Sequence, residues 1–434
     1  MTLNQAIEQA LSYSPNLAGA REDLEAATSR RKETITGFLP TLSTDYNYYR
    51  TQDLTRIRTR YGDLYTGSLN TYQWSTSVSQ PIFTGFKLSS TYKLADLGVD
   101  FSELQVFLTR LDVAYSAKKA FFEYLKAQKS LDVANQQVVQ LTSHLQTARD
   151  FFDVGILPTN DVLKVEVELA EAQQQLVQAD NSVSVTRATL NTLLGRPVGA
   201  DLKTQDELNY HEVKIGYEQA RQTGRVERPE LKAIEVQLQQ GQENVRQAEA
   251  GYYPQVNLQA SYIFTGENWD FGDSSVYDPT NWQVVTAVNW PFWEWGRTLH
   301  QVNQKRANLR KLESTRRDLQ DQVELQIKQS WLSLKDSEKN ISTARTSIVS
   351  AEENFRITQE RFKEQLTTNT EVLDAQTLLT KARNNYYTAL TQYNLAEAAL
   401  LRSMGRGLPP GLDAKPTPEE MLKPAPPAGA ASDK

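Results

Sequence analysis

Two long stretches of the chain combine a helical spacing of apolar residues with an absence of proline. No proline lies between Pro81 and Pro158, and none lies between Pro291 and Pro409. Apolar residues recur there at alternating spacings of three and four, which is the heptad pattern of packed helices. They include Leu94, Leu97, Phe101, Leu104, Leu108 and Leu111 in the first stretch and Ile341, Ala344, Ile348, Ala351, Phe355 and Phe362 in the second. The pattern predicts helices over residues 87–154 and 297–365, each about 100 Å long at ~1.5 Å per residue.

Four shorter segments alternate between apolar and polar residues with a period of two, which is typical of strands with two different faces. The same alternation occurs in half-solvated soluble sheets and in membrane strands. Aromatic residues favour the membrane, because Trp and Tyr gather at bilayer interfaces. The candidate interface aromatics are Tyr46, Tyr48, Tyr72, Trp74, Tyr262, Phe264, Trp282 and Trp290.

The second half of the chain repeats landmarks of the first half at an offset near 210 residues. Pro81 corresponds to Pro291, and Gly195 corresponds to Gly405. Self-similarity of this kind indicates an internal duplication. Each repeat then contains a helix of about 35 residues, two strands, one long helix, a short turn and a second helix of about 35 residues. The shorter helices are expected over 2–36, 160–194, 216–250 and 371–404.

These repeats define the predicted domain organisation. We expect a first structural repeat over residues 1–200 and a second over residues 201–407. We expect residues 408–434, which contain seven prolines, to form a disordered Pro/Ala-rich tail.

The composition excludes several classes of protein. A bilayer-spanning helix needs about 18 or more consecutive apolar residues, and the chain contains no such run. A net charge of −6 argues against a nucleic-acid partner. There is no cysteine, and His144, His211 and His300 lie far apart in the sequence, so we expect surface histidines, no metal site, no cofactor and no catalytic centre. The chain begins without a charged segment followed by an apolar one, so it is expected to be cytosolic or a mature protein without its leader.

Amphipathic strands in a membrane require a closed barrel, because an open edge in lipid leaves backbone groups unpaired. Four strands are too few, since bacterial barrels begin at about eight and are even-numbered. The strand count therefore predicts a dimer or a trimer.

With these features the chain resembles the TolC-like outer-membrane factor family over roughly residues 2–407. The resemblance rests on Pro81-Ile82-Phe83-Thr84-Gly85, on residues 154–163 at the first turn, and on Glu371-Val372-Leu373-Asp374-Ala375 after the second turn. It implies an α+β membrane protein: a homotrimer with four strands per protomer, a 12-stranded β-barrel, and a long α-helical coiled-coil barrel continuous with it.

The resemblance also implies a location and a function. The expected location is the outer membrane of a Gram-negative bacterium, with most of the chain in the periplasm. The expected function is passive export of small molecules such as drugs, or of proteins, as the duct of a tripartite efflux pump or a type I secretion system. The implied partners are a periplasmic adaptor (membrane fusion) protein, an inner-membrane pump of the RND or ABC type, and outer-membrane lipid.

The family's constriction lies at the inner helical ends, and the resemblance assigns candidate gate residues there. Glu371 and Asp374 match acidic residues that ring the pore, although both would also suit a helix N-terminus. Asp161 matches an aspartate that a tyrosine and an arginine hold in the family's closed state. Here Phe362 and Thr367 occupy those donor positions, so we expect packing of Phe362, in place of charged links, to close the duct.

The turns between the helices are the candidate adaptor-docking surface. Gly155 and Pro158 are also explained as turn residues, with Thr159 or Asn160 as a candidate N-cap. The proposed docking residues are Gly155, Ile156, Leu157, Pro158, Thr159, Leu366 and Thr368.

Two other functions stay open at this point. A periplasmic adaptor should have one helical hairpin and small β modules without a duplication, and a cytosolic coiled-coil scaffold would leave the alternating strands unexplained.

Overall fold

The computed structural model describes residues 1–271 and 278–409. The chain divides into two compact units. The first comprises residues 1–24, 103–233 and 316 onward, and the second comprises 25–102 and 234–315. The last helix ends before the region predicted as a tail, of which residues 410–434 lie outside the described residues. None of the described helices combines the length and the apolar composition that a bilayer crossing requires.

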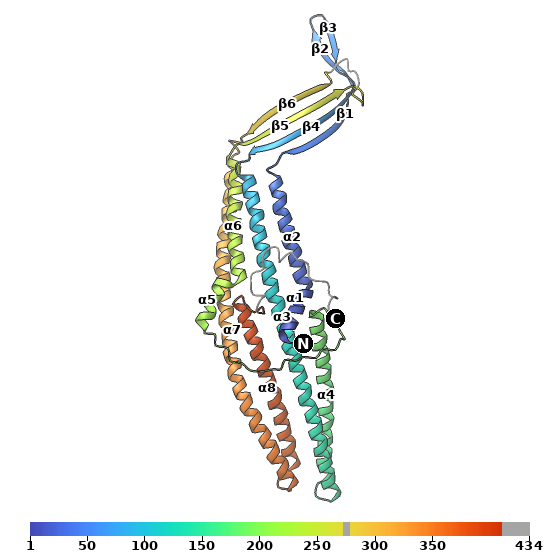
Figure 1. The fold of residues 1–434 in the computed structure, drawn as a ribbon, viewed down its shortest axis with the longest axis vertical. Helices are drawn as coiled ribbons and strands as arrows, with labels where there is room; N and C mark the ends of the chain where they lie inside the picture. Colours follow the sequence, from blue (N-terminus) through green and yellow to red (C-terminus); the bar gives the residue numbers. More distant parts are fainter. Residues whose placement is uncertain (272–277, 410–434) are drawn as a thin grey trace, which may run out of the picture. The chain divides into compact units, whose positions relative to one another are not determined.

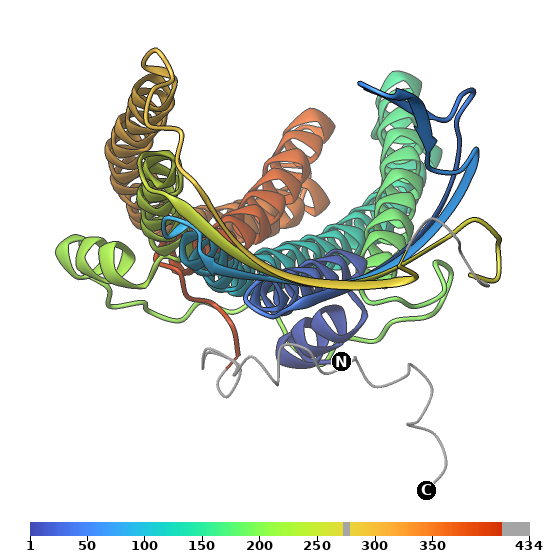
Figure 2. The same ribbon diagram turned by 90° about the horizontal axis from the view of Figure 1, so that it is seen from above.

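The first unit is built from long helices. It contains α8 (Asn369–Ser403), α4 (Thr159–Leu193) and the C-terminal parts, from residues 316 and 103 onward, of α7 (Arg297–Lys363) and α3 (Lys87–Asp153). These lie side by side in the order α7, α8, α3, α4, as a curved layer with α7 and α4 at its ends (Figures 1 and 2). The long helices have 67 residues each and the shorter pair 35 each. The predicted long helices and the helices after them are therefore confirmed to within two residues at each end.

The two other predicted 35-residue helices are wrong in one respect, because a proline breaks each of them. Helix α1 (Leu3–Tyr13) is followed by α2 (Pro15–Thr36), and α5 (Tyr217–Glu227) is followed by α6 (Pro229–Glu249). The residue before a proline is pushed out of the helical region. Accordingly Ser14 has ψ 115° and Arg228 has ψ 121°. Proline suits the first position of a new helix, where its missing N–H costs nothing.

The second unit contains a four-stranded antiparallel sheet. Its strands are β1 (Thr41–Arg50), β4 (Asn70–Phe83), β5 (Gln255–Gly266) and β6 (Thr280–Asn289), in the order β1-β4-β5-β6. The four predicted strands are confirmed. Two further strands, β2 (Thr55–Thr59) and β3 (Gly62–Thr66), form a separate hairpin between β1 and β4 (Figure 1), and a short 3-10 helix, η1 (Ala250–Tyr252), precedes β5. The sequence prediction missed the hairpin because its strands have five residues each and carry only Ile57, Leu64 and Tyr65 as apolar or aromatic residues.

The register of the sheet gathers the predicted apolar positions on one face. Tyr46 lies opposite Trp74, and Trp74 lies opposite Phe264. Tyr262, two residues from Phe264 along β5 and therefore on the same face, lies opposite Trp282. Directly paired residues of an antiparallel sheet share a face. The opposite face carries polar pairs such as Ser43 with Ser77.

Candidate channel gate at the helical tips

The helical hairpins of the first unit end in two turns with the same geometry. Gly155 has φ 79°, and the N–H of Ile156 donates to the carbonyl oxygen of Phe151 at 2.8 Å. In the second turn Gln365 has φ 58°, and the N–H of Leu366 donates to the carbonyl oxygen of Arg361 at 2.7 Å. Both turns are the left-handed ending that usually takes glycine. The second turn achieves it with glutamine, at some cost in backbone strain.

The candidate docking residues lie in and beside these turns. Ile156 and Leu366 are exposed, whereas Leu157 packs against a buried cluster that contains Leu145 and Leu373. Thr368 caps α8, because its hydroxyl accepts from the N–H of Glu371 at 3.3 Å. By contrast, the prediction that Thr159 or Asn160 caps α4 is wrong.

Helix α4 begins at Thr159, so neither Thr159 nor Asn160 can be the residue that caps it. Pro158 is its N-cap and makes no side-chain cap bond, while Thr159 and Asn160 lie inside the helix. The N–H of Asp161 donates to the carbonyl oxygen of Pro158 at 3.0 Å instead. A proline that already has an extended conformation can start the helix without a hydroxyl or amide cap.

Asn369, at the start of α8, joins the two hairpins. Its Nδ2 donates to the main-chain oxygen of Asp161 on α4 at 3.0 Å. Its Oδ1 lies 2.7 Å from Nε2 of His144 on α3. Because an amide oxygen only accepts, His144 Nε2 carries the hydrogen in this pair. The amide is 2% exposed, so both hydrogen bonds are shielded from water.

Phe362 supports the same junction from α7. Its side chain is 3% exposed, and its ring centroid lies 5.0 Å from that of His144 and 5.5 Å from that of Phe151. Tilted ring pairs at these distances add to the energy of burial. The expectation that His144 is a surface histidine is wrong, because it is 5% exposed between Phe362 and Asn369. His300 is exposed as expected, and the exposed ring of His211 lies 3.1 Å from Glu397.

The other candidate gate residues are arranged separately from this junction. The carboxylate of Asp161 pairs with Lys164 of its own helix at 3.0 Å. Thr367 donates its hydroxyl hydrogen to the carboxylate of Glu371. The gate candidates therefore do not form one connected group, and Asp161 contributes its main-chain oxygen to the junction.

The predicted interface aromatics other than Trp290 lie toward the end of the sheet near Gly266. Tyr48 and Tyr72 have ring centroids 4.8 Å apart, and Trp74 stacks on Phe264 at 5.2 Å. Trp290 lies at the other end, just beyond β6, with its ring 6.4 Å from that of Phe292. Further rings that the sequence prediction did not include lie beside that end: Phe83, Phe86, Tyr253, Trp293 and Trp295.

The family model described as outer membrane efflux protein matches residues 6–196 and 220–406. The chain belongs to the outer membrane efflux protein family. The resemblance to TolC-like factors, the outer-membrane location and the role in export are thereby confirmed.

Individual members of the outer membrane efflux protein family are distant in sequence and close in fold. The alkaline protease secretion protein AprF of Pseudomonas aeruginosa is 24% identical over 403 residues, covering 90% of this chain and 82% of that protein. The outer membrane protein TolC of Escherichia coli K12 is 22% identical over 438 residues, covering 93% and 82%. The structure of the outer membrane protein VceC of Vibrio cholerae aligns with a TM-score of 0.80 at 17% identity, covering 94% of this chain and 96% of that one.

Asp374 of this efflux-family chain lies in an acidic surrounding that the sequence did not indicate. Burial raises the pKa of Glu168 on α4, and the negative charges of Glu171 and Asp374 raise it further. Asp374, the predicted pore residue of α8, is therefore within electrostatic range of Glu168 on α4.

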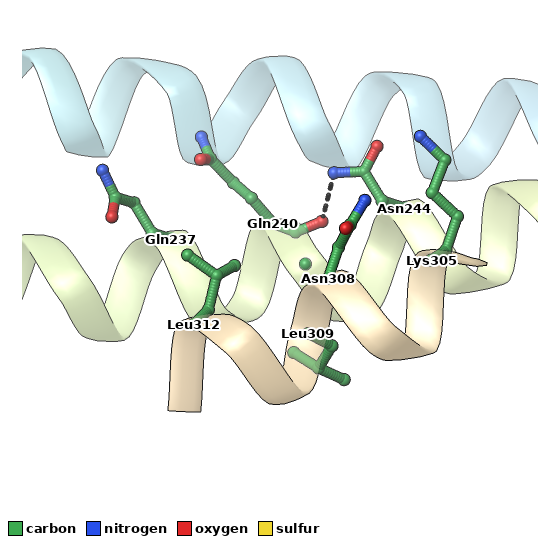
Figure 3. Close-up of a pocket in the computed structure, with 8 residues that line it drawn as sticks. Gln237, Gln240, Asn244, Lys305, Asn308, Leu309 and Leu312 are labelled. Atoms are coloured by element: carbon green, nitrogen blue, oxygen red, sulfur yellow. Dashed lines mark hydrogen bonds between the residues drawn. The ribbon is translucent and has the colours of Figure 1, made fainter. Parts of the chain in front are cut away.

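The second unit contains a cavity of about 350 Å³ (Figure 3). It lies between α6 and α7 and is lined by amide side chains, two leucines and Lys305. Asn244 Nδ2 donates to the main-chain oxygen of Gln240 at 2.8 Å. Gly241 leaves room for the side chain of Leu309, because a Cβ at position 241 would lie 3.0 Å from it. We interpret this cavity as a packing gap, because its polar side chains do not converge on one point.

We expect acid to loosen the junction around His144. Burial lowers the pKa of His144 below its ordinary value of 6.5, although the hydrogen bond to Asn369 opposes this effect. A base with a lowered folded-state pKa binds protons more readily when unfolded, so the stability is complete above 6.5 and declines as the pH falls toward the folded-state pKa. The protection of residues 360–370 against hydrogen exchange, corrected for the intrinsic exchange rate of each amide, should therefore fall between about pH 7 and about pH 5.

The variant His144→Gln is the matched control for this pH effect. Its amide can still donate to Asn369 but does not titrate in this range. Exchange at residues 360–370 should then depend on pH only through the intrinsic chemistry of the amides. An equal residual pH dependence in both proteins would assign the effect to another group.

Proposed function

We propose that this chain is one protomer of a trimeric duct whose strands close into a single 12-stranded barrel in the outer membrane. The observation that carries the proposal is a four-stranded sheet with one apolar face and two edge strands, β1 and β6, whose outer edges pair with no strand among the described residues. Such edges are intolerable in lipid. Pairing of β6 with β1 of the next protomer removes them.

The spacing of the aromatic groups supports a membrane-spanning sheet. Trp282 and Trp290 stand at opposite ends of the apolar face, eight residues apart. At ~3.3 Å per residue this spacing is about 26 Å. The apolar band of outer-membrane barrels is about 25 Å tall. Exposed apolar side chains between the two groups, such as Val78 and Val284, would then face lipid.

The helices support the same trimer. Leu163, Val167 and Val177 are exposed on α4, and Leu325 and Leu332 are exposed on α7. These helices form the two ends of the curved layer of the first unit (Figure 2). Packing α4 of one protomer on α7 of the next would cover both surfaces and build the helical barrel.

We also propose the internal duplication, with repeats over 1–200 and 201–407. It is supported by the identical lengths of α3 and α7 and of α4 and α8. The two ranges matched by the family model fall one in each repeat.

The helical tips are proposed as the inner end of the duct. Exposed Ile156 and Leu366 would contact a periplasmic adaptor protein, which links the duct to an inner-membrane pump in a tripartite efflux or type I secretion system. Asn369 and Phe362 would hold the two hairpins together in the closed state. Glu371 and Asp374 would line the narrowest part of the pore and favour cations.

Oligomeric mass tests the central claim. We expect the purified protein to require detergent and to elute as three chains by light scattering, because four amphipathic strands leave unpaired edges in lipid. A proline at Val285, in the middle of edge strand β6, should reduce the trimer fraction by removing a ladder donor. A stable monomer without detergent would contradict the proposal.

A further inference from the structure

The β2–β3 hairpin lacks the packing partners that usually stabilise a pair of strands. Thr55 pairs with Thr66 and Thr59 with Gly62, and neither strand pairs with another strand among the described residues. A two-stranded hairpin alone is marginally stable in water. Its outer edges also leave backbone groups without partners. A surface that covers one face of the hairpin would stabilise it.

One face of the hairpin is apolar and the other is charged. Ile57 and Leu64 lie opposite each other and are 48% and 55% exposed. On the other face Asp63 lies 3.5 Å from Arg56 and 3.8 Å from Arg58. Tyr61, in the turn, is 97% exposed. Apolar exposure of this kind on a segment surrounded by water marks a contact surface.

The connectivity places the hairpin at the outer end of the sheet. Strand β1 follows α2 and β4 leads into α3, so the helices leave from the opposite end of these strands. Because most of the chain is periplasmic, the hairpin end faces the exterior. Within the second unit the hairpin leans toward the concave side of the curved sheet (Figure 2), which would be the lumen of a closed barrel.

We propose that the occupant of the apolar face is a second copy of the same hairpin, so that three hairpins pack through Ile57 and Leu64 as a lid over the outer mouth. This inference rests on the trimer proposed above. A second copy is favoured because the hairpin directly follows β1 in the chain. Strand β1 is the edge strand where the neighbouring protomer would join. The lid narrows the exit of the duct, independently of the gate at the helical tips.

The charge of the hairpin makes the lid sensitive to salt. Each copy carries Arg56, Arg58 and Arg60 against Asp63, so three copies around one axis repel each other. Salt screens such charges beyond about 10 Å at 0.1 M. The lid therefore closes more firmly as the ionic strength rises, which is the reverse of an interface held by ion pairs.

Cysteine cross-linking tests the lid with no background, because the chain has no cysteine. Ile57→Cys is oxidised with copper-phenanthroline in air, which takes up the two electrons released when two thiols form a disulfide. We expect disulfide-linked dimers whose yield rises with added sodium chloride. Arg58→Cys, one residue away on the charged face, is the matched control and should cross-link several-fold less.

The outcomes separate the lid from the trimer. Light scattering on each variant reports the trimer, and Leu64→Cys repeats the test if Ile57→Cys folds poorly. An intact trimer in which neither Ile57→Cys nor Leu64→Cys cross-links overturns the lid and leaves the duct standing. Equal cross-linking of Arg58→Cys also overturns it. Replacing residues 56–65 by a short Gly-Ser turn should raise the conductance of the reconstituted channel about twofold, since an exit constriction is removed, and an unchanged conductance would count against the lid.

Discussion

Asn369→Ala should raise the resting conductance of the reconstituted channel about thirtyfold to several-hundredfold. The substitution removes the bond to the main-chain oxygen of Asp161 and leaves the buried Nε2–H of His144 without an acceptor. A net hydrogen bond contributes about 1 kcal/mol, and a buried donor left unpaired costs about 1–3 kcal/mol. Each 1.4 kcal/mol changes an equilibrium about tenfold. The measurement is single-channel recording in planar bilayers at neutral pH.

Two further variants give this prediction its control. Asp161→Ala should leave the conductance within a small factor of wild type, because the junction uses the main-chain oxygen of Asp161 while its carboxylate pairs with Lys164 on a partly exposed surface. Phe362→Ala should open the channel, since loss of a buried phenyl ring costs about 3–5 kcal/mol. If Asp161→Ala opened the channel many-fold and Asn369→Ala did not, the carboxylate would have a partner in the functional trimer that replaces this junction.

The elements that the sequence predicted correctly are those with a strong period. Helices α3 and α7 contain long runs of heptad-spaced apolar residues, and the four sheet strands alternate regularly, so local pattern and tertiary packing agree there. The breaks before Pro15 and Pro229 were signalled by the prolines themselves. The apolar residues on either side of each proline nevertheless follow one helical pattern, which predicts a single helix.

The junction at the tips could not be predicted in the same way. His144 and Asn369 are 225 residues apart in sequence, and no local spacing relates them. One signal was available for His144. It lies between Leu141 and Leu145 on the buried side of α3, which placed it near the core. Asn369 follows the capping residue Thr368, a position where an amide is ordinarily explained by the helix end alone.

The acidic residues at the tips should control block by polyvalent cations. We expect the double variant Glu371→Gln, Asp374→Asn to weaken block by a trivalent cation about tenfold, because carboxylates repeated around a three-fold axis concentrate the field in the pore. The structure makes the two residues unequal. Glu371 accepts a hydrogen bond from Thr367 and lies in the first turn of α8, where a negative charge also serves the helix.

Asp374 should therefore account for most of the effect. It lies close enough to Glu168 to raise the pKa of that side chain, so a cation at Asp374 is attracted by α4 as well as by α8. Asp374→Asn alone should reproduce most of the loss of block, and adding Glu168→Gln should enlarge it. Glu353→Gln is the matched control, because it removes one carboxylate from exposed α7 where Arg356 pairs with it at 2.6 Å, and block should then stay as in wild type. Titrating the cation from the tip side of the bilayer gives the blocking constant for each protein. Unchanged block in both Asp374→Asn and the double variant would place the constriction outside the first turns of α8.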